Sequence, residues 1–121
     1  MNKSRPVIGV VGPCAAGKTT LSNSLRELGY AAKPIAQEHS FAPTMWQRIT
    51  NPSILIYLDV TYDVSMQRRK MNWNEAEFEE QHRRLAHARE HADFYLHTDP
   101  LTINEVLERT VDFLESHLSD S

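Results

Sequence analysis

The residues whose types and spacing point most directly to chemistry lie near the start of the chain, at Gly12-Pro-Cys-Ala-Ala-Gly-Lys18-Thr19. They match the pattern G-x-x-x-x-G-K-[ST] without a departure. Glycine lets the backbone curl so that its N–H groups face phosphate oxygens, and a helix beginning near Lys18 adds its positive end. The lysine reaches the β- and γ-phosphates, and the Thr19 hydroxyl binds Mg²⁺. The segment therefore predicts a site for a nucleoside triphosphate with Mg²⁺.

Residues 12–17, called the glycine loop below, supply most of this predicted site. Thr20 lies one residue deeper in the helix and is a candidate for contact with the α-phosphate. Cys14 is the one cysteine of the chain, so it cannot form an intrachain disulfide. We expect it to fill space in the loop, with oxidation as the alternative. The predicted nucleotide-binding residues are Gly12, Pro13, Cys14, Ala15, Ala16, Gly17, Lys18, Thr19 and Thr20.

Short apolar runs alternate with amphipathic stretches along the chain. Near-continuous apolar runs predict strands over 7–11 and 53–58, buried on both faces. A weaker strand over 30–36 contains Pro34, which favours the edge of a sheet, and a short last strand covers 93–97. Helices are predicted over 18–28, 62–70, 74–91 and 102–118, with one further turn near 44–49. This order predicts an α/β fold of three layers, with helices on both faces of a short, mostly parallel sheet of about four strands.

Composition and charge narrow the class of protein. No linker or repeat divides residues 1–121, so we expect a single domain. Residues 1–37 carry a net charge of +4 and residues 93–121 a net charge of −6, and so acidic an end argues against a nucleic acid polymer as partner. No apolar run is long enough to cross a membrane, and none indicates a signal peptide. We therefore expect a cytoplasmic protein with no membrane partner.

Three stretches resemble known enzymes. Residues 7–25 resemble the first strand, P-loop and first helix of P-loop kinases, closer to small-molecule and nucleotide kinases than to GTPases. Pro52 to Val60, with Gln67-Arg-Arg69, is similar to the late strand and pre-lid helix of thymidylate and deoxynucleoside kinases. Residues 83–99 are similar to the end of the lid and the last strand of shikimate-kinase-like enzymes. The resemblance implies a P-loop NTPase fold and an ATP-dependent phosphotransferase (kinase) that uses Mg²⁺ and acts on a small hydroxyl- or phosphate-bearing acceptor.

The chain is short for these families. Only sixteen residues, 37–52, stand where the relatives build their acceptor-binding region. This favours, as an alternative, a nucleotide-binding or slow NTPase module without an intact acceptor site. A homodimer is compatible with the same observation, because a partner could supply a missing wall. The Asn/Thr-Lys-x-Asp pattern by which GTPases read guanine is absent from the sequence.

Phosphoryl transfer needs a carboxylate near the metal and the attacking oxygen. Glu38 has a placement similar to the acid of deoxynucleoside kinases, and we predict that it serves as a Mg²⁺ ligand, partly through water and together with Thr19, or as general base. Glu38 and His39 are also the candidates for holding the acceptor. The alternative for both is a solvated turn. Asp59 is the competing carboxylate, but the resemblance places its strand further from the glycine loop, and its alternative role is to cap the following helix.

Positive charge must offset the charge of the transferred group. Lys18 and Arg89 are predicted to do so, since Arg89 best matches the end of the lid. Arg83 and Arg84 are further lid candidates, and Arg68 and Arg69 complete the pool. The alternative is pairing with carboxylates along helix surfaces.

His87-Ala-Arg-Glu-His91 matches a zinc pattern, although we favour exposed histidines. Trp46 and Trp73 are expected in packing, with stacking on a ring as the alternative.

Overall fold

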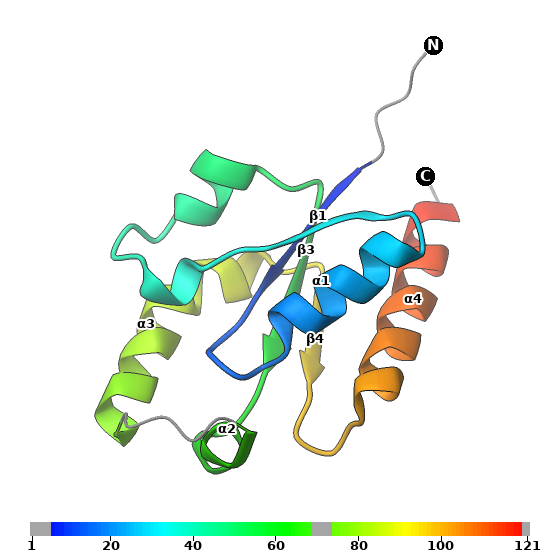
Figure 1. Ribbon diagram of the computed structural model, residues 1–121. Helices are drawn as coiled ribbons and strands as arrows, with labels where there is room; N and C mark the ends of the chain where they lie inside the picture. Colours follow the sequence, from blue (N-terminus) through cyan, green and yellow to red (C-terminus); the bar gives the residue numbers. More distant parts are fainter. Residues whose placement is uncertain (1–5, 69–73, 120–121) are drawn as a thin grey trace.

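Four strands form one sheet, and every neighbouring pair is parallel. The computed structural model describes residues 6–68 and 74–119, and its spatial strand order is β2-β1-β3-β4 (Figure 1). The α/β prediction is confirmed, and the sheet is entirely rather than mostly parallel. Pro34 lies on the edge strand, where a missing N–H is tolerated. The strands are β1 (Val7–Val11), β2 (Ala31–Pro34), β3 (Ile54–Asp59) and β4 (Phe94–His97).

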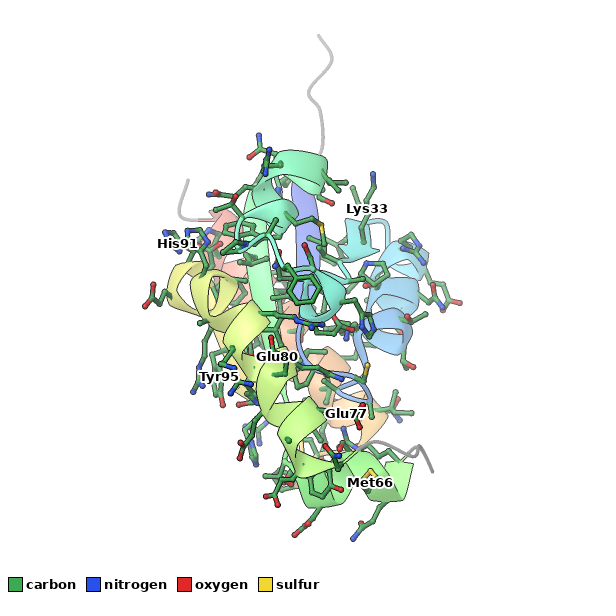
Figure 2. The ribbon with its side chains drawn as sticks, turned by 90° about the vertical axis from the view of Figure 1, so that its left-hand side faces the viewer. Lys33, Met66, Glu77, Glu80, His91 and Tyr95 are labelled. Carbon is green, nitrogen blue, oxygen red and sulfur yellow. The ribbon has the colours of Figure 1, made fainter. Side chains whose placement is uncertain are left out.

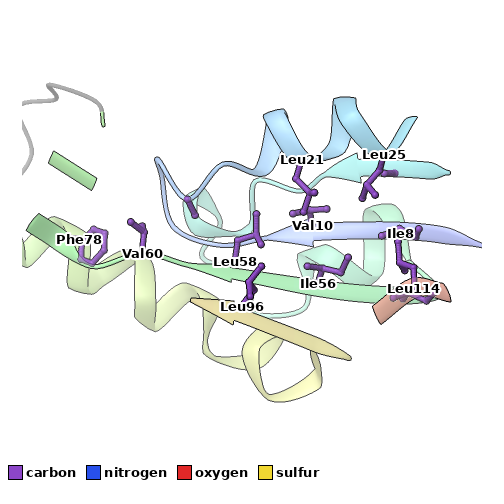
Figure 3. Packing of buried hydrophobic residues seen from close by; sticks show 13 residues of the cluster. Ile8, Val10, Leu21, Leu25, Ile56, Leu58, Val60, Phe78, Leu96 and Leu114 are labelled. Carbon is purple, nitrogen blue, oxygen red and sulfur yellow. The ribbon is translucent and has the colours of Figure 1, made fainter. Parts of the chain in front are cut away.

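Helices cover both faces of this sheet because alternate side chains of β3 enter two different cores. Ile54, Ile56 and Leu58 pack with residues of α1 and α4 in one cluster (Figure 3). Leu55 and Tyr57 belong to the other cluster, with residues of α3 and the 37–52 segment. A strand with both faces covered must be apolar throughout, as the 53–58 run predicted. The helices are α1 (Lys18–Glu27), α2 (Tyr62–Arg68), α3 (Glu75–His91) and α4 (Ile103–Ser119), with the 3₁₀ turn η1 (Gln37–His39) and the π-helical turn η2 (Trp46–Thr50).

The helix ends follow local signals in the sequence. The Asn74 side chain accepts from the Glu77 N–H while the Glu77 carboxylate accepts from the Asn74 N–H, so the predicted capping box opens α3. Thr102 and Glu105 make the same exchange before α4. Ile103 departs from the predicted apolar stripe of α4, being 65% exposed. The last residues of the predicted 62–70 helix lie outside the described residues, as do Arg69 and Trp73.

The expectation that the strand over 53–58 lies away from the glycine loop is wrong. Strand β3 pairs directly with β1, with Ile8 opposite Ile54 and Val11 opposite Tyr57. Residues 37–52 form the turns η1 and η2 rather than a strand, so nothing in that segment separates the two. The end of β3 consequently lies against the start of the glycine loop.

None of the helices within residues 6–68 and 74–119 is both long enough and apolar enough to cross a lipid bilayer.

Candidate functional site

The glycine loop leaves the carboxyl end of β1 and turns tightly into α1. Gly12 has φ +154°, and a Cβ at this position would lie 2.1 Å from the carbonyl oxygen of Leu58, so only glycine fits. Gly17 adopts the left-handed conformation at the N-cap of α1, where no described side chain caps the helix. The first-turn N–H groups of a helix have no partner within it. The loop therefore presents uncapped backbone donors, which suit an anion.

Lys18 and Glu38 form an ion pair beside this loop. The Lys18 ammonium donates to the carbonyl oxygens of Gly12 and Pro13, at 2.8 and 3.1 Å, and to Glu38 Oε2 at 2.9 Å. The side chains of the pair are only 11% and 4% exposed. An ammonium has three donors, and these three bonds use all of them. To contact a phosphate, Lys18 must break at least one of these three hydrogen bonds.

Glu38 is brought to the glycine loop because η1 follows the edge strand β2 at the same end of the sheet. Its Oε2 lies 3.8 Å from Cys14 Sγ and 3.6 Å from His39 Nε2. Its Oε1 is buried and has no hydrogen-bond partner among the described residues. A buried acceptor without a partner is costly, so such an atom is commonly reserved for an ion, a water or a substrate.

Helix α3 braces this arrangement from the face of the sheet opposite α1, the side that Figure 2 turns toward the viewer. The buried Gln81 side chain accepts from the Cys14 N–H at 3.0 Å. Arg84 donates to the Glu38 carbonyl at 3.4 Å, and its guanidinium lies over the Phe41 ring at 4.2 Å. The glycine loop and η1 are thus tied to the same helix.

A cavity of about 490 Å³ adjoins the glycine loop on the α1–α4 side. Its walls come from residues 15–17, one side of α1, and the start of α4 with apolar Leu101, Val106 and Leu107. Arg68 closes one end, donating to the carbonyls of Ala15 and Thr98 at 3.0 and 2.8 Å. The volume and the largely apolar walls are typical of a small-molecule site.

Asp59 is the centre of a second polar cluster. Its carboxylate accepts from the Val60 N–H at 2.9 Å, lies 3.4 Å from His82 Nε2, and accepts a hydrogen bond from the Tyr95 hydroxyl. Burial opposes ionisation, but the hydrogen bonds from His82 and Tyr95 outweigh it and lower the pKa of Asp59. The hydrogen bond to Asp59 raises the pKa of His82 against the opposing effect of burial. Burial and the same carboxylate raise the pKa of Tyr95 to about 12. A hollow of about 320 Å³ lies beside Asp59 and His82.

The predicted arginines lie in different places: Arg68 at the glycine loop, Arg89 at the Asp59 cluster and Arg83 against another side chain of α3. Arg89 lies over the rings of Tyr95 and Tyr57, at 5.0 and 5.8 Å, on the Asp59 side. Arg83 pairs with half-buried Glu80 at 2.5 Å, and hydrogen bonding from Arg83 lowers the pKa of this carboxyl. Arg68 is the arginine that contacts the glycine loop.

The remaining predicted residues fall outside these contacts. Thr19 and Thr20 are exposed on the first turn of α1, and Thr20 lines the 490 Å³ cavity. Trp46 is buried, and its indole N–H donates to His87 Nδ1 at 3.2 Å. The ring of His91 stacks on that of His87 at 4.2 Å between centroids.

Sequence reasoning did not assign Gln81, His82 or Tyr95 to either region. Gln81 contacts a residue 67 positions away, and Tyr95 one 36 positions away. The available signal was helical spacing, because Gln81, Leu85 and Ala88 form one buried face of α3. That spacing identifies a buried polar residue but not its partner.

No protein-family model matches the chain, and no curated protein matches it.

Proposed function

We propose that this chain binds Mg-ATP through the glycine loop and transfers a phosphoryl group to a small hydroxyl- or phosphate-bearing acceptor. The observation that carries the proposal is the convergence of Lys18, the uncapped start of α1 and buried Glu38 at one end of a parallel sheet. Uncapped N–H groups and an ammonium suit polyphosphate, and a carboxylate beside them suits a metal or an attacking hydroxyl. The residues present therefore fit the group that the motif predicts.

The nucleotide would occupy two adjoining parts of this end of the molecule. The N–H groups of residues 15–20 and the Lys18 ammonium would hold the phosphates, and Thr19 and Glu38 would hold Mg²⁺. The cavity beside Arg68 would take the base, because its walls are apolar and it opens from residues 15–17. Bound Mg²⁺ neutralises charge on the phosphates during transfer.

Exchange at Lys18 is the central step for the chain's own residues. Moving the ammonium toward a phosphate oxygen releases Glu38 Oε2 from its 2.9 Å bond. Glu38 then has two oxygens available, since Oε1 already has no described partner. The freed carboxylate would help to hold Mg²⁺ or would accept the proton of the acceptor hydroxyl. Binding of phosphate and activation of Glu38 are thus coupled through one lysine.

A specific observation favours the alternative of a nucleotide-binding or slow NTPase module. The 37–52 segment folds closely onto its surroundings, with Gln37 donating to the carbonyls of Ala42 and Arg84 and accepting from the Trp46 N–H. Neither of the two hollows described above includes Glu38 or His39 among its lining residues. An acceptor would have to bind on a surface that this segment leaves open.

Phosphoryl transfer is tested by ADP formation with a panel of hydroxylated and phosphorylated small molecules, with the product observed by phosphorus NMR. We expect one acceptor to raise the rate and become phosphorylated in equal amount to ADP. Glu38→Gln lowers that rate by about a hundredfold or more, while the matched Glu115→Gln on α4 leaves it unchanged. Acceptor-independent phosphate release, insensitive to Glu38→Gln, would contradict transfer and favour the NTPase alternative.

A further inference from the structure

Cys14, Glu38 and His39 place three different metal-binding atoms around one point at the mouth of the glycine loop. Among the described parts of the chain, these are the one group of three such side chains whose ligand atoms lie within 4.8 Å of one another. We propose that they form a site for a thiophilic divalent cation of the zinc class. This site shares Glu38 with the proposed Mg²⁺ position and adds Cys14 and His39, and the argument for it does not rest on the proposed function.

The spacing of the three atoms matches a tetrahedral ion. Zinc bonds of about 2.3 Å to sulfur and about 2.0–2.2 Å to nitrogen and oxygen place neighbouring ligand atoms about 3.4–3.6 Å apart. The Sγ–Nε2 and Nε2–Oε2 separations are both 3.6 Å, and the Sγ–Oε2 separation is 3.8 Å. Three corners of the tetrahedron are therefore already near their final positions.

The ligand types select the class of metal. A thiolate with an imidazole favours Zn²⁺ and its relatives, whereas Mg²⁺ prefers an all-oxygen octahedral set. The cysteine thiolate and the carboxylate together neutralise a divalent ion, and the thiol proton leaves to solvent as the metal binds. A fourth position remains for water, as in zinc sites with three protein ligands.

Two features of the surroundings support the site. Glu38 is buried with Oε1 unsatisfied among the described residues, so its carboxylate has capacity beyond its bond to Lys18. Gln81 and Arg84 hold the backbone of Cys14 and Glu38 from α3, as an outer shell holds metal ligands in place. The His39 side chain is 60% exposed, which gives an ion a path from solvent.

Lys18 sets the consequence of binding. Its ammonium lies 2.9 Å from Glu38 Oε2, so a divalent ion bound to that oxygen competes with it. The ion would then also fix Cys14 within the loop that is proposed to hold phosphates. Zinc-class ions should therefore antagonise Mg-ATP at this loop rather than assist it.

The site is tested with Co²⁺, which reports its ligands through its absorption spectrum. The chain of residues 1–121, free of nucleotide and treated with a chelator, is titrated with Co²⁺ and then with Zn²⁺ as competitor. We expect one equivalent to bind with visible bands of a tetrahedral ion and a thiolate-to-cobalt charge-transfer band, which Zn²⁺ removes. Since the chain has one cysteine, that band identifies Cys14. Cys14→Ser abolishes it, and His39→Ala weakens Co²⁺ binding by at least about tenfold.

The matched control is His91→Ala, because His87 and His91 are one turn apart on α3 and their rings stack. Removing His91 should leave the charge-transfer band and the affinity unchanged. Binding of Co²⁺ without a thiolate band, lost in His91→Ala, would assign the metal to the α3 histidines and overturn the proposal. The absence of any Co²⁺ or Zn²⁺ binding would overturn it equally. Either result leaves nucleotide binding to be judged separately, since no nucleotide is present.

Discussion

Glu38 and Asp59 are two carboxylates at the same end of the sheet, each beside a histidine, yet their surroundings differ. The oxygens of Asp59 accept from Val60, His82 and Tyr95, all within the chain. Glu38 has Lys18 at 2.9 Å on one oxygen, with His39 and Cys14 further away at 3.6 and 3.8 Å, and no described partner on the other oxygen. The Asp59 cluster satisfies its own carboxylate, whereas Glu38 depends on one cation that a phosphate competes for. Position after a strand does not distinguish the two carboxylates, but their hydrogen bonds do.

The largest effect on stability should follow from removing the cation that pairs with Glu38. Lys18→Met leaves a buried carboxylate without a cation, and we expect the free energy of unfolding to fall by about 3 kcal/mol. His82→Ala leaves Asp59 with two donors, and the expected loss is about 1 kcal/mol. Urea denaturation of both variants measures the difference.

The control for this experiment is Lys18→Met/Glu38→Gln, which removes the charge together with its partner. It should recover most of the stability lost in Lys18→Met. Equal losses in Lys18→Met and His82→Ala, with no recovery in the double variant, would contradict the contrast between the two carboxylates.

The elements could be predicted from the sequence because their signals are local. The apolar 53–58 run and the Asn74 and Thr102 boxes act over a few residues, and each determines one strand or one helix end. Contacts between the elements could not be predicted this way. The bond from Arg68 to Ala15 spans 53 positions and exists only because α2 follows a strand that pairs directly with β1. A motif identifies the loop, but the strand order decides which side chains surround it.

Arg68 and Arg89 belong to different sides of the comparison, so their removal should affect Mg-ATP binding differently. Arg68 contacts the glycine loop and closes the cavity, whereas Arg89 lies over Tyr95 in the Asp59 cluster. We expect Arg68→Ala to weaken Mg-ATP binding about tenfold, equivalent to about 1.4 kcal/mol. Arg89→Ala should change it less than about twofold, a small fraction of that free energy. Fluorescence titration with a labelled ATP analogue measures the affinity of both variants. A larger loss of affinity in Arg89→Ala than in Arg68→Ala would support the lid role predicted for Arg89 and contradict this expectation.

The smallest expected effect is the change with pH in the stability that the Asp59 cluster contributes. The ionised Asp59 carboxylate contributes to stability above pH 3.8, the ordinary pKa of an aspartate. This contribution is lost as pH falls through the lowered pKa of Asp59. The protonated His82 ring contributes to stability below pH 6.5, the ordinary pKa of a histidine. This contribution is lost as pH rises through the raised pKa of His82. The stability difference between wild type and Asp59→Asn should therefore be greatest between these values. Urea midpoints across pH measure it, and NMR titration should show the pKa of His82 falling in Asp59→Asn. A His82 pKa unchanged by the substitution would show that the pair does not form.

The central claim is that Lys18 and the glycine loop bind a nucleoside triphosphate with Mg²⁺. Calorimetric titration of Mg-ATP into Glu38→Gln and into Lys18→Met/Glu38→Gln tests it most directly, because neither variant leaves the Glu38 charge buried without a cation. Circular dichroism confirms that both remain folded. We predict that Glu38→Gln binds and that the added loss of Lys18 weakens binding about a hundredfold, as expected for a hydrogen bond to a charged group. Equal affinities of the two variants, or no binding by Glu38→Gln at millimolar nucleotide, would contradict the claim.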